Sequence, residues 1–158
     1  MSDVPENIEQ FNFATLAILD ALYTGFPIPA VDFRPATACL HRLPKETPFE
    51  DAWHAGSIAD ATLTWLAAEG FVTIGRLTTP SGGFGDVRLT LKGLALLWSV
   101  PGPFVPGGVP KPLSQRIKGA LSSGTQYVGA EAIKAIVGDV IKFGVAYAKD
   151  SGLALMGS

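Results

Sequence analysis

The residue types that could support nucleophilic catalysis lie between positions 39 and 54. Cys39 could act as the nucleophile, His41 or His54 as its base, and Asp51 as the acid that orients the base. Because Cys39 and His41 are two residues apart, their side chains would point to opposite faces of a strand and align poorly on a helix. We therefore predict a half-buried cysteine, a surface histidine and no enzymatic activity.

The sequence also predicts neither a metal site nor a phosphate-binding loop. One cysteine and two histidines that lie thirteen residues apart do not make a closed tetrahedral metal site. The glycine-rich string SGGFG lacks the lysine and the strand-to-helix setting of a phosphate-binding loop. We therefore expect no metal, no cofactor and no small-molecule substrate.

Composition favours a cytoplasmic protein with an apolar contact surface. The single cysteine cannot form an internal disulfide, and the N-terminal MSDVPENIEQ lacks the layout of a signal peptide. No window of eighteen residues is uncharged and predominantly apolar, so no membrane span is predicted. The mean hydropathy of +0.31, with 47% hydrophobic residues, suggests that some apolar surface is buried against another chain.

Charge is distributed unevenly along the chain. Residues 1–100 contain six Lys/Arg and eleven Asp/Glu, a balance of −5, whereas residues 101–158 contain six and three, a balance of +3. An acidic first part is a poor electrostatic match for a phosphate backbone.

Periodic apolar residues predict the helices of the first part. Phe13, Leu16, Leu19 and Leu22 indicate a helix over residues 12–25. Residues 26–47 contain four prolines, and within them only ATACLHRL could form one or two helical turns. Whether this region supplies the second helix of a motif or an insertion before it stays open.

Two further helices and a hairpin are expected next. Thr47, Pro48 and Glu50 indicate the start of a helix that runs to about Ala55, with Gly56 as a turn. A second helix should then start at a capping Ser57 and end at Gly70. The runs FVTIGRL and DVRLTL, separated by TTPSGGFG, predict a β-hairpin with a flexible loop, and a short helix over LALLW should follow Gly93.

This order of helices and hairpin resembles the winged helix-turn-helix superfamily. The resemblance lies in TLTWLAAEGFV, a helix that runs through Glu-Gly into a strand, and in LTLKGLALL, an exit from the wing similar to that of bacterial MarR and PadR regulators. It covers roughly 90 residues and implies a winged-helix domain over residues 10–100. Similar small bacterial proteins of this layout imply no particular activity.

Binding to DNA is the main alternative that the resemblance implies. A winged helix places its third helix in the major groove, and its wing contacts the backbone. The outward face of that helix is expected to carry no basic side chain, only Asp60, Thr62, Thr64, Ala67, Ala68 and Glu69. The residues that could contact DNA are therefore Thr62 and Thr64 on the helix and Arg76, Arg88 and Lys92 on the wing.

The C-terminal part is expected to be an interaction element. A Pro/Gly-rich linker at residues 101–112 precedes a helical segment at 113–150, which contains glycines 119, 124 and 129. Because small residues allow helices to approach closely, we predict contacts through an apolar stripe. The residues expected to interact are Leu121, Val128, Ile136, Val140 and Phe143, together with Phe84 on the hairpin loop. Three alternatives stay open, namely packing on its own domain, pairing with another chain, and association with a membrane, which Asp139 and Lys142 disfavour.

Together these features predict a mainly α-helical chain with a small β-hairpin, of the α+β class. The predicted function is that of a non-enzymatic winged-helix module acting through protein contacts, by self-association or as an adaptor in a bacterial assembly. A transcriptional regulator that binds DNA through its wing and dimerises through its tail is the alternative.

Overall fold

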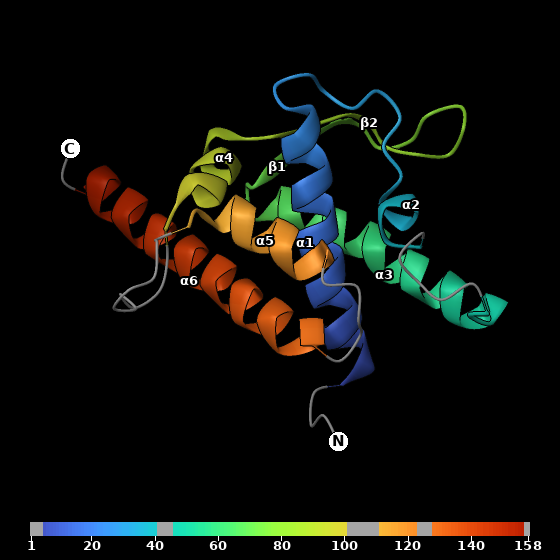
Figure 1. Cartoon of the computed structure of the whole chain (residues 1–158). Helices are drawn as coiled ribbons and strands as arrows, with labels where there is room; N and C mark the ends of the chain where they lie inside the picture. The colour runs from blue at the N-terminus through green and yellow to red at the C-terminus, as the bar shows by residue number, and fades with distance from the viewer. Residues whose placement is uncertain (1–4, 41–45, 101–110, 123–127, 157–158) are drawn as a thin grey trace.

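The computed structural model describes residues 5–40, 46–100, 111–122 and 128–156. These residues form a mainly helical α+β structure with a two-stranded antiparallel hairpin, which confirms the predicted fold class (Figure 1). In chain order the elements are α1 (Glu6–Gly25), α2 (Pro35–Leu40), α3 (Phe49–Ala68), β1 (Val72–Arg76), β2 (Gly85–Leu89), α4 (Leu91–Trp98), α5 (Leu113–Ser122) and α6 (Val128–Met156).

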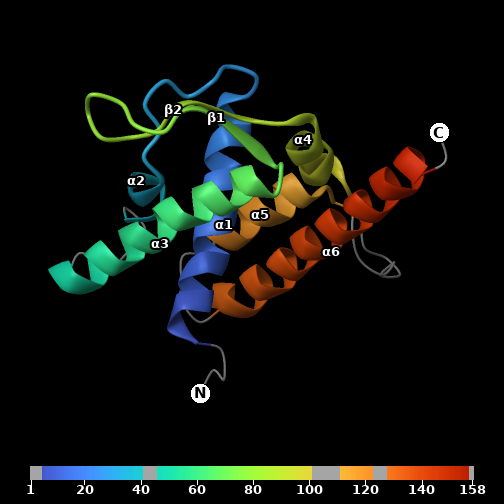
Figure 2. The ribbon, with the colours of Figure 1, turned by 180° about the vertical axis from the view of Figure 1, so that it is seen from behind.

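Helix α1 is the central helix of the core. Every residue from Ala14 to Leu19 is buried, so the helix is covered around its circumference rather than along one stripe. Helices α2, α3, α5 and α6 all pack against it (Figure 2). The helix predicted over residues 12–25 is thus present, begins at Glu6, and is more deeply buried than its sequence pattern indicates, because the C-terminal helices also cover it.

The region predicted as two helices with a turn at Gly56 forms the single helix α3, so that prediction is wrong. Gly56 is buried, and a Cβ added to it would lie 3.3 Å from the Cβ of Ala36 in α2. Ser57, expected to cap a helix, instead donates its hydroxyl to the carbonyl of Trp53 within α3, at 3.1 Å. The glycine therefore allows α2 to approach α3 closely, and does not end a helix.

Helix α3 ends where the sequence predicts. Gly70 adopts a φ of 84°, in the left-handed region that glycine tolerates best. The N–H of Phe71 donates to the carbonyl of Leu66 at 2.9 Å, and the N–H of Gly70 to that of Ala67 at 3.1 Å. These two bonds form a Schellman motif, which turns the chain directly into β1.

The hairpin confirms the two predicted strands, and a segment before α2 also pairs with it, which the sequence did not predict. Val72 pairs with Leu89 and Ile74 with Val87. On the other side of β2, residues 30–33 form two antiparallel bridges, Ala30 with Val87 and Phe33 with Phe84, with hydrogen bonds of 2.7 to 3.0 Å. The proline-containing region at 26–47 therefore extends the hairpin and also supplies helix α2.

The C-terminal helices belong to the same core as the rest of the chain. Their buried side chains all join one apolar cluster with α1 and α3: Leu113, Ile117, Leu121, Ile136, Val137 and Val140. The N–H of Leu113 donates to the carbonyl of Ser99 at 2.8 Å, which holds the start of α5 against the end of α4. Most of the predicted linker, residues 101–110, lies outside the described residues. Of the three alternatives for the tail, packing on its own domain is the arrangement observed.

Helices α3 and α6 extend beyond the core in opposite directions. Figures 1 and 2 show the N-terminal end of α3 and the C-terminal end of α6 at opposite sides of the molecule. No helix in the described part of the chain combines the length and apolar character needed to cross a bilayer.

Candidate interaction surface

The residues considered for catalysis differ in exposure where the structure describes them. Cys39 is buried in α2, whereas Asp51 and His54 are exposed on α3, and His41 lies outside the described residues. Within the described ranges, no three His, Cys, Asp or Glu side chains are placed to hold a metal ion.

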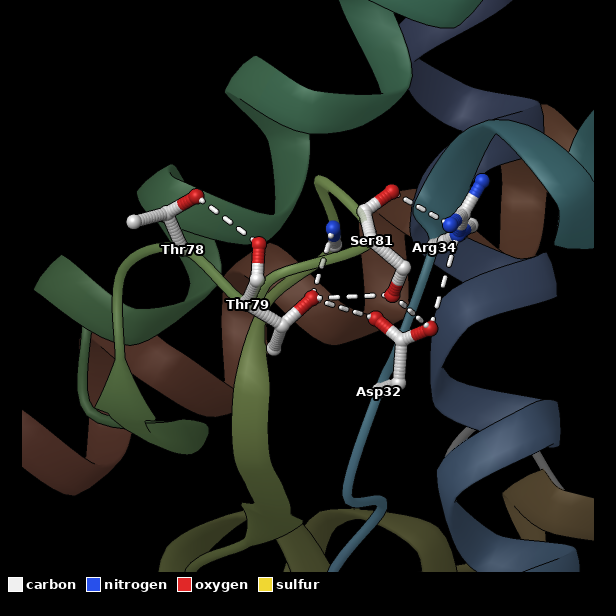
Figure 3. Close-up of polar contacts among 6 residues, drawn as sticks. Asp32, Arg34, Thr78, Thr79 and Ser81 are labelled. Carbon is white, nitrogen blue, oxygen red and sulfur yellow. Dashed lines mark hydrogen bonds and ion pairs between the residues drawn. The ribbon is translucent and has the colours of Figure 1, made fainter.

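A polar cluster joins the hairpin loop to the segment before α2 (Figure 3). The carboxylate of Asp32 accepts hydrogen bonds from the hydroxyls of Ser81 at 2.6 Å and Thr79 at 2.7 Å. Arg34 places its Nε 3.6 Å from the same carboxylate and donates to the carbonyl of Ser81. The N–H of Gly83 donates to the Thr79 hydroxyl at 3.0 Å, so the loop predicted to be flexible is tied at several points.

The electrostatics of this cluster argue for a structural role. The hydrogen bonds from Ser81 and Thr79, and then the charge of Arg34, hold the pKa of Asp32 below its usual value. A carboxylate with a lowered pKa is a weak base and does not activate a hydroxyl as a nucleophile. Asp32 is therefore poorly suited to act as a general base, and its hydrogen bonds hold the loop against the segment before α2.

Phe84 lies between the loop and the core. Its backbone pairs with that of Phe33 through bonds of 2.7 and 2.8 Å, and its side chain is partly buried against the core. Phe84 is therefore held against the fold, and its contact with a partner stays a prediction.

The helix residues considered for DNA binding are only partly accessible. Thr62 is buried and donates its hydroxyl to the carbonyl of Ile58 at 2.6 Å, so the prediction that it faces outward is wrong. The reason is that Thr62 lies on the same side of α3 as the core residues Ala59 and Leu66. Thr64 is exposed, with its hydroxyl bonded to the carbonyl of Asp60 at 3.1 Å.

Two of the three wing cations are engaged within the chain. The Nε of Arg76 lies 3.6 Å from the carboxylate of Asp86. Lys92 donates to the carbonyl of Glu69 at 2.7 Å, and its Nζ lies over the ring of Phe71 at 4.6 Å and over that of Tyr147 at 5.1 Å. Arg88 is exposed, opposite Thr73 in the hairpin.

The tail residues expected to contact a partner mostly face the chain's own core. Leu121, Ile136 and Val140 are buried, and Phe143 is partly buried against the same cluster. Val128 begins α6, and its side chain lies outside the described residues. In this conformation the predicted stripe is covered by its own fold.

The glycines expected at a close helix interface have no such role where they are described. A Cβ added to Gly119 would meet nothing within 4 Å, while Gly124 and Gly129 lie outside the residues whose packing is described. A Cβ on Gly144, by contrast, would lie 3.2 Å from the ring of Phe71. The close approach in the tail is therefore at Gly144.

An exposed aromatic and acidic surface, which sequence reasoning missed, covers the projecting half of α3. Phe49 and Trp53 are 79% and 70% exposed, and their rings stack with centroids 6.5 Å apart. Together with Glu50 they line a shallow open depression. Asp60 and Thr64 follow along the same side of the helix, and partial burial raises the pKa of Asp60. We call these five residues the α3 surface.

The outer side of α6 carries a surface of the opposite character. Ile141 and Val145 are 48% and 65% exposed. Exposed lysines flank them, namely Lys134, Lys142 and Lys149, and we call these five residues the α6 surface. The buried side chains of α6, by contrast, lie on the opposite side of the helix.

The signal for the α3 surface was present in the sequence. Phe49 and Trp53 are four residues apart, which places two large aromatic rings on one face of any helix that starts at Pro48. Their exposure could not be foreseen, because an apolar pair at this spacing more often faces the core.

Comparison with known proteins adds no relative to these observations. No protein-family model matches the sequence, and neither the curated proteins nor the solved structures give a significant match.

Proposed function

We propose that this chain is a non-catalytic, winged-helix-like module that works by binding protein through the α3 surface. The observation that carries the proposal is the stacked, exposed pair of Phe49 and Trp53 at the projecting end of α3. Two aromatic rings expose far more apolar area than an isolated surface leucine does, and leaving them in water costs free energy.

The chemistry around the two rings is that of a protein interface. Tryptophan and phenylalanine are enriched where proteins meet, and they supply much of the binding free energy when they enter a pocket on the partner. Glu50 beside them and Asp60 further along add negative charge at the rim. The surface therefore favours a partner with an apolar strip flanked by positive charges.

The winged-helix resemblance supports a recognition role for α3, although one feature of the chain differs from a helix-turn-helix motif. Three helices followed by a hairpin agree with the expected order, and α3 takes the place of the recognition helix. The connection between α2 and α3, however, spans residues 41–48, whereas helix-turn-helix motifs use a turn of about three or four residues. A cytoplasmic location, which the single cysteine favours, is part of the same proposal.

A site-specific photo-crosslinking experiment in cells tests the proposal. A photoreactive amino acid at position 53 should give discrete crosslinked protein species. The matched control carries the same amino acid at Thr73, an exposed position on β1, and should give none. If position 53 gives no more crosslinks than position 73, the α3 surface does not bind protein and the proposal is wrong.

Duplex DNA is the second candidate partner, and the observation that favours it is the ordered hairpin loop. The Asp32 cluster, which includes Arg34, fixes that loop, and Arg88 is exposed on β2. Against DNA binding, α3 contains Glu50, Asp51 and Asp60 and no Lys or Arg, so phosphates would be repelled from it.

The measurement for the second candidate is fluorescence anisotropy with labelled duplex DNA at low salt. If DNA is the partner, changing both Arg76 and Arg88 to alanine should abolish binding. Retained affinity in that double variant would count against a mode led by the wing.

A further inference from the structure

We propose that the partner of the α3 surface is the α6 surface of a second copy of this chain. This inference rests on the proposed function, since it names the protein that the α3 surface binds. It is carried by two exposed helix faces of the same molecule that are opposite in charge and alike in length.

The two surfaces are complementary in charge. The α3 surface carries the carboxylates Glu50 and Asp60, and the whole of α3 contains no lysine or arginine. The α6 surface carries three exposed lysines, namely Lys134, Lys142 and Lys149. Of the three acids of α6, Asp139 is paired with Arg116 of α5 at 3.0 Å, whereas Glu131 and Asp150 are exposed just outside the stretch from Lys134 to Lys149.

The two surfaces are also complementary in apolar area and in length. Phe49 and Trp53 on one side meet Ile141 and Val145 on the other, and all four are exposed. Phe49 to Thr64 and Lys134 to Lys149 each span fifteen helical steps, which corresponds to about 22 Å at 1.5 Å per residue.

The spacing of the residues selects an antiparallel pairing. When Phe49 is set opposite Lys149, Glu50 lies beside that lysine and Trp53 falls opposite Val145. Asp60 then lies between Lys142 and Lys134, about 6 Å along the axis from each, which is within reach of a lysine side chain. A parallel pairing would instead set Trp53 opposite Gly138, so the tryptophan ring would no longer lie opposite Val145.

Every residue of the two surfaces is exposed, so both surfaces are accessible to a second copy. The α3 and α6 ends lie at opposite sides of the molecule in both views (Figures 1 and 2). When an α3 surface of one copy binds an α6 surface of another, the complex still has one free α3 surface and one free α6 surface, unless the copies form a closed ring. Association is therefore expected to increase with protein concentration.

The first experiment is light scattering on the purified full-length protein over a range of concentrations. The wild type should have a mass above that of the monomer, and the mass should fall as salt rises from about 50 mM to about 500 mM, because the lysine–carboxylate pairs are exposed and are screened. A monomer at every concentration would overturn the inference.

Charge reversal gives a sharper test with a built-in control. One variant reverses the charges of the α3 surface (Glu50→Lys with Asp60→Lys), and the other reverses charges of the α6 surface (Lys142→Glu with Lys149→Glu). Each should weaken self-association by about tenfold or more, because several exposed ion pairs are lost together. An equimolar mixture of the two variants should associate again, since the reversed α3 of one faces the reversed α6 of the other. Failure of the mixture to associate would overturn the pairing, and its recovery shows that both variants are folded.

The outcomes separate this inference from the proposed function. A monomeric wild type that still crosslinks at position 53 to a different protein would refute self-pairing and leave the α3 surface as a binding site. A monomer without crosslinks would refute both. A monomeric wild type that sediments with anionic phospholipid vesicles, while the Lys142→Glu, Lys149→Glu variant does not, would assign the α6 surface to lipid and also overturn self-pairing.

Discussion

Replacing Val140 with alanine tests whether α6 is part of the cooperative core. The side chain of Val140 is fully buried in the apolar cluster that also contains residues of α1 and α3. Losing two methyl groups removes about 1.6 kcal/mol of burial free energy. The space left behind adds about 1 kcal/mol, so the free energy of unfolding should fall by about 2 to 3 kcal/mol in total.

Thermal and urea denaturation, followed by far-UV circular dichroism at low protein concentration, measure this loss. For a chain of this length the loss corresponds to a fall in Tm of about 5 to 10 °C. Val31→Ala is the matched control, because the same two methyl groups are removed from a side chain that is 65% exposed. It should change the free energy of unfolding by less than about 0.5 kcal/mol.

The result that would refute this reasoning is an equal effect of the two substitutions. If Val140→Ala unfolds at the same midpoint as Val31→Ala, α6 does not share the core that the structure assigns to it. An early, separate transition in the Val140 variant would likewise show that α6 unfolds independently of the rest.

Three further predictions concern the hairpin loop and the glycines. Asp32→Asn should shift the Gly83 amide signal in NMR spectra at neutral pH. In the wild type the same shift should appear only as the pH falls below about 3.8, the usual pKa of an aspartate, because the pKa of Asp32 in the folded chain is lower than that. The stabilisation of the folded chain by the Asp32 carboxylate is therefore complete above this pH and is lost as Asp32 is protonated. Identical spectra of the variant and the wild type at neutral pH would contradict this. Gly70→Ala should cost about 1 to 2 kcal/mol in urea denaturation, since alanine is strained at a φ of 84°, and an unchanged midpoint would contradict the left-handed cap. Gly93→Ala should cost about 1 to 3 kcal/mol, because its Cβ would collide with the carbonyl oxygen of Phe71. The control Gly119→Ala, which meets nothing within 4 Å, should stabilise the chain by up to about 1 kcal/mol, and equal effects at the two positions would refute the contact at Gly93.

The parts of the fold that depend on neighbouring residues could be predicted from the sequence. The end of α3 at Gly70 follows from the tolerance of glycine for the left-handed region, and the hairpin follows from two β-branched runs around a glycine-rich loop. The helix-breaking prolines likewise place the end of α1 correctly.

The errors arose where a residue serves a distant contact. Gly56 and Ser57 have the composition of a turn and a cap, yet Gly56 is there because α2 packs against it at Ala36. Thr62 is polar, yet it is buried because it lies on the side of α3 that faces the core, where its hydroxyl bonds to the carbonyl of Ile58. Neither the contact at Gly56 nor the burial of Thr62 can be recognised from local sequence, because the element that faces each residue is fixed only by the fold.

The candidate site shows the same division. The charge imbalance between the two parts of the chain and the Phe49–Trp53 spacing are properties of the sequence. The sequence does not decide which apolar residues remain exposed. The stripe that contains Ile136 and Val140 and the pair Phe49 and Trp53 are equally apolar in sequence, yet the stripe is buried in the core and the aromatic pair stays in solvent.

The sequence by itself determined the fold class, the hairpin, the end of α3 and the acidic character of that helix, since each depends on local conformational preference or on residue type. Only the tertiary structure decided that α3 is continuous, that residues 30–33 complete the hairpin edge, and that the tail is buried against α1. These outcomes depend on which apolar faces meet. Burial is favourable for any well-packed pair of faces, so the choice is made by the shape and chain connectivity of the whole molecule.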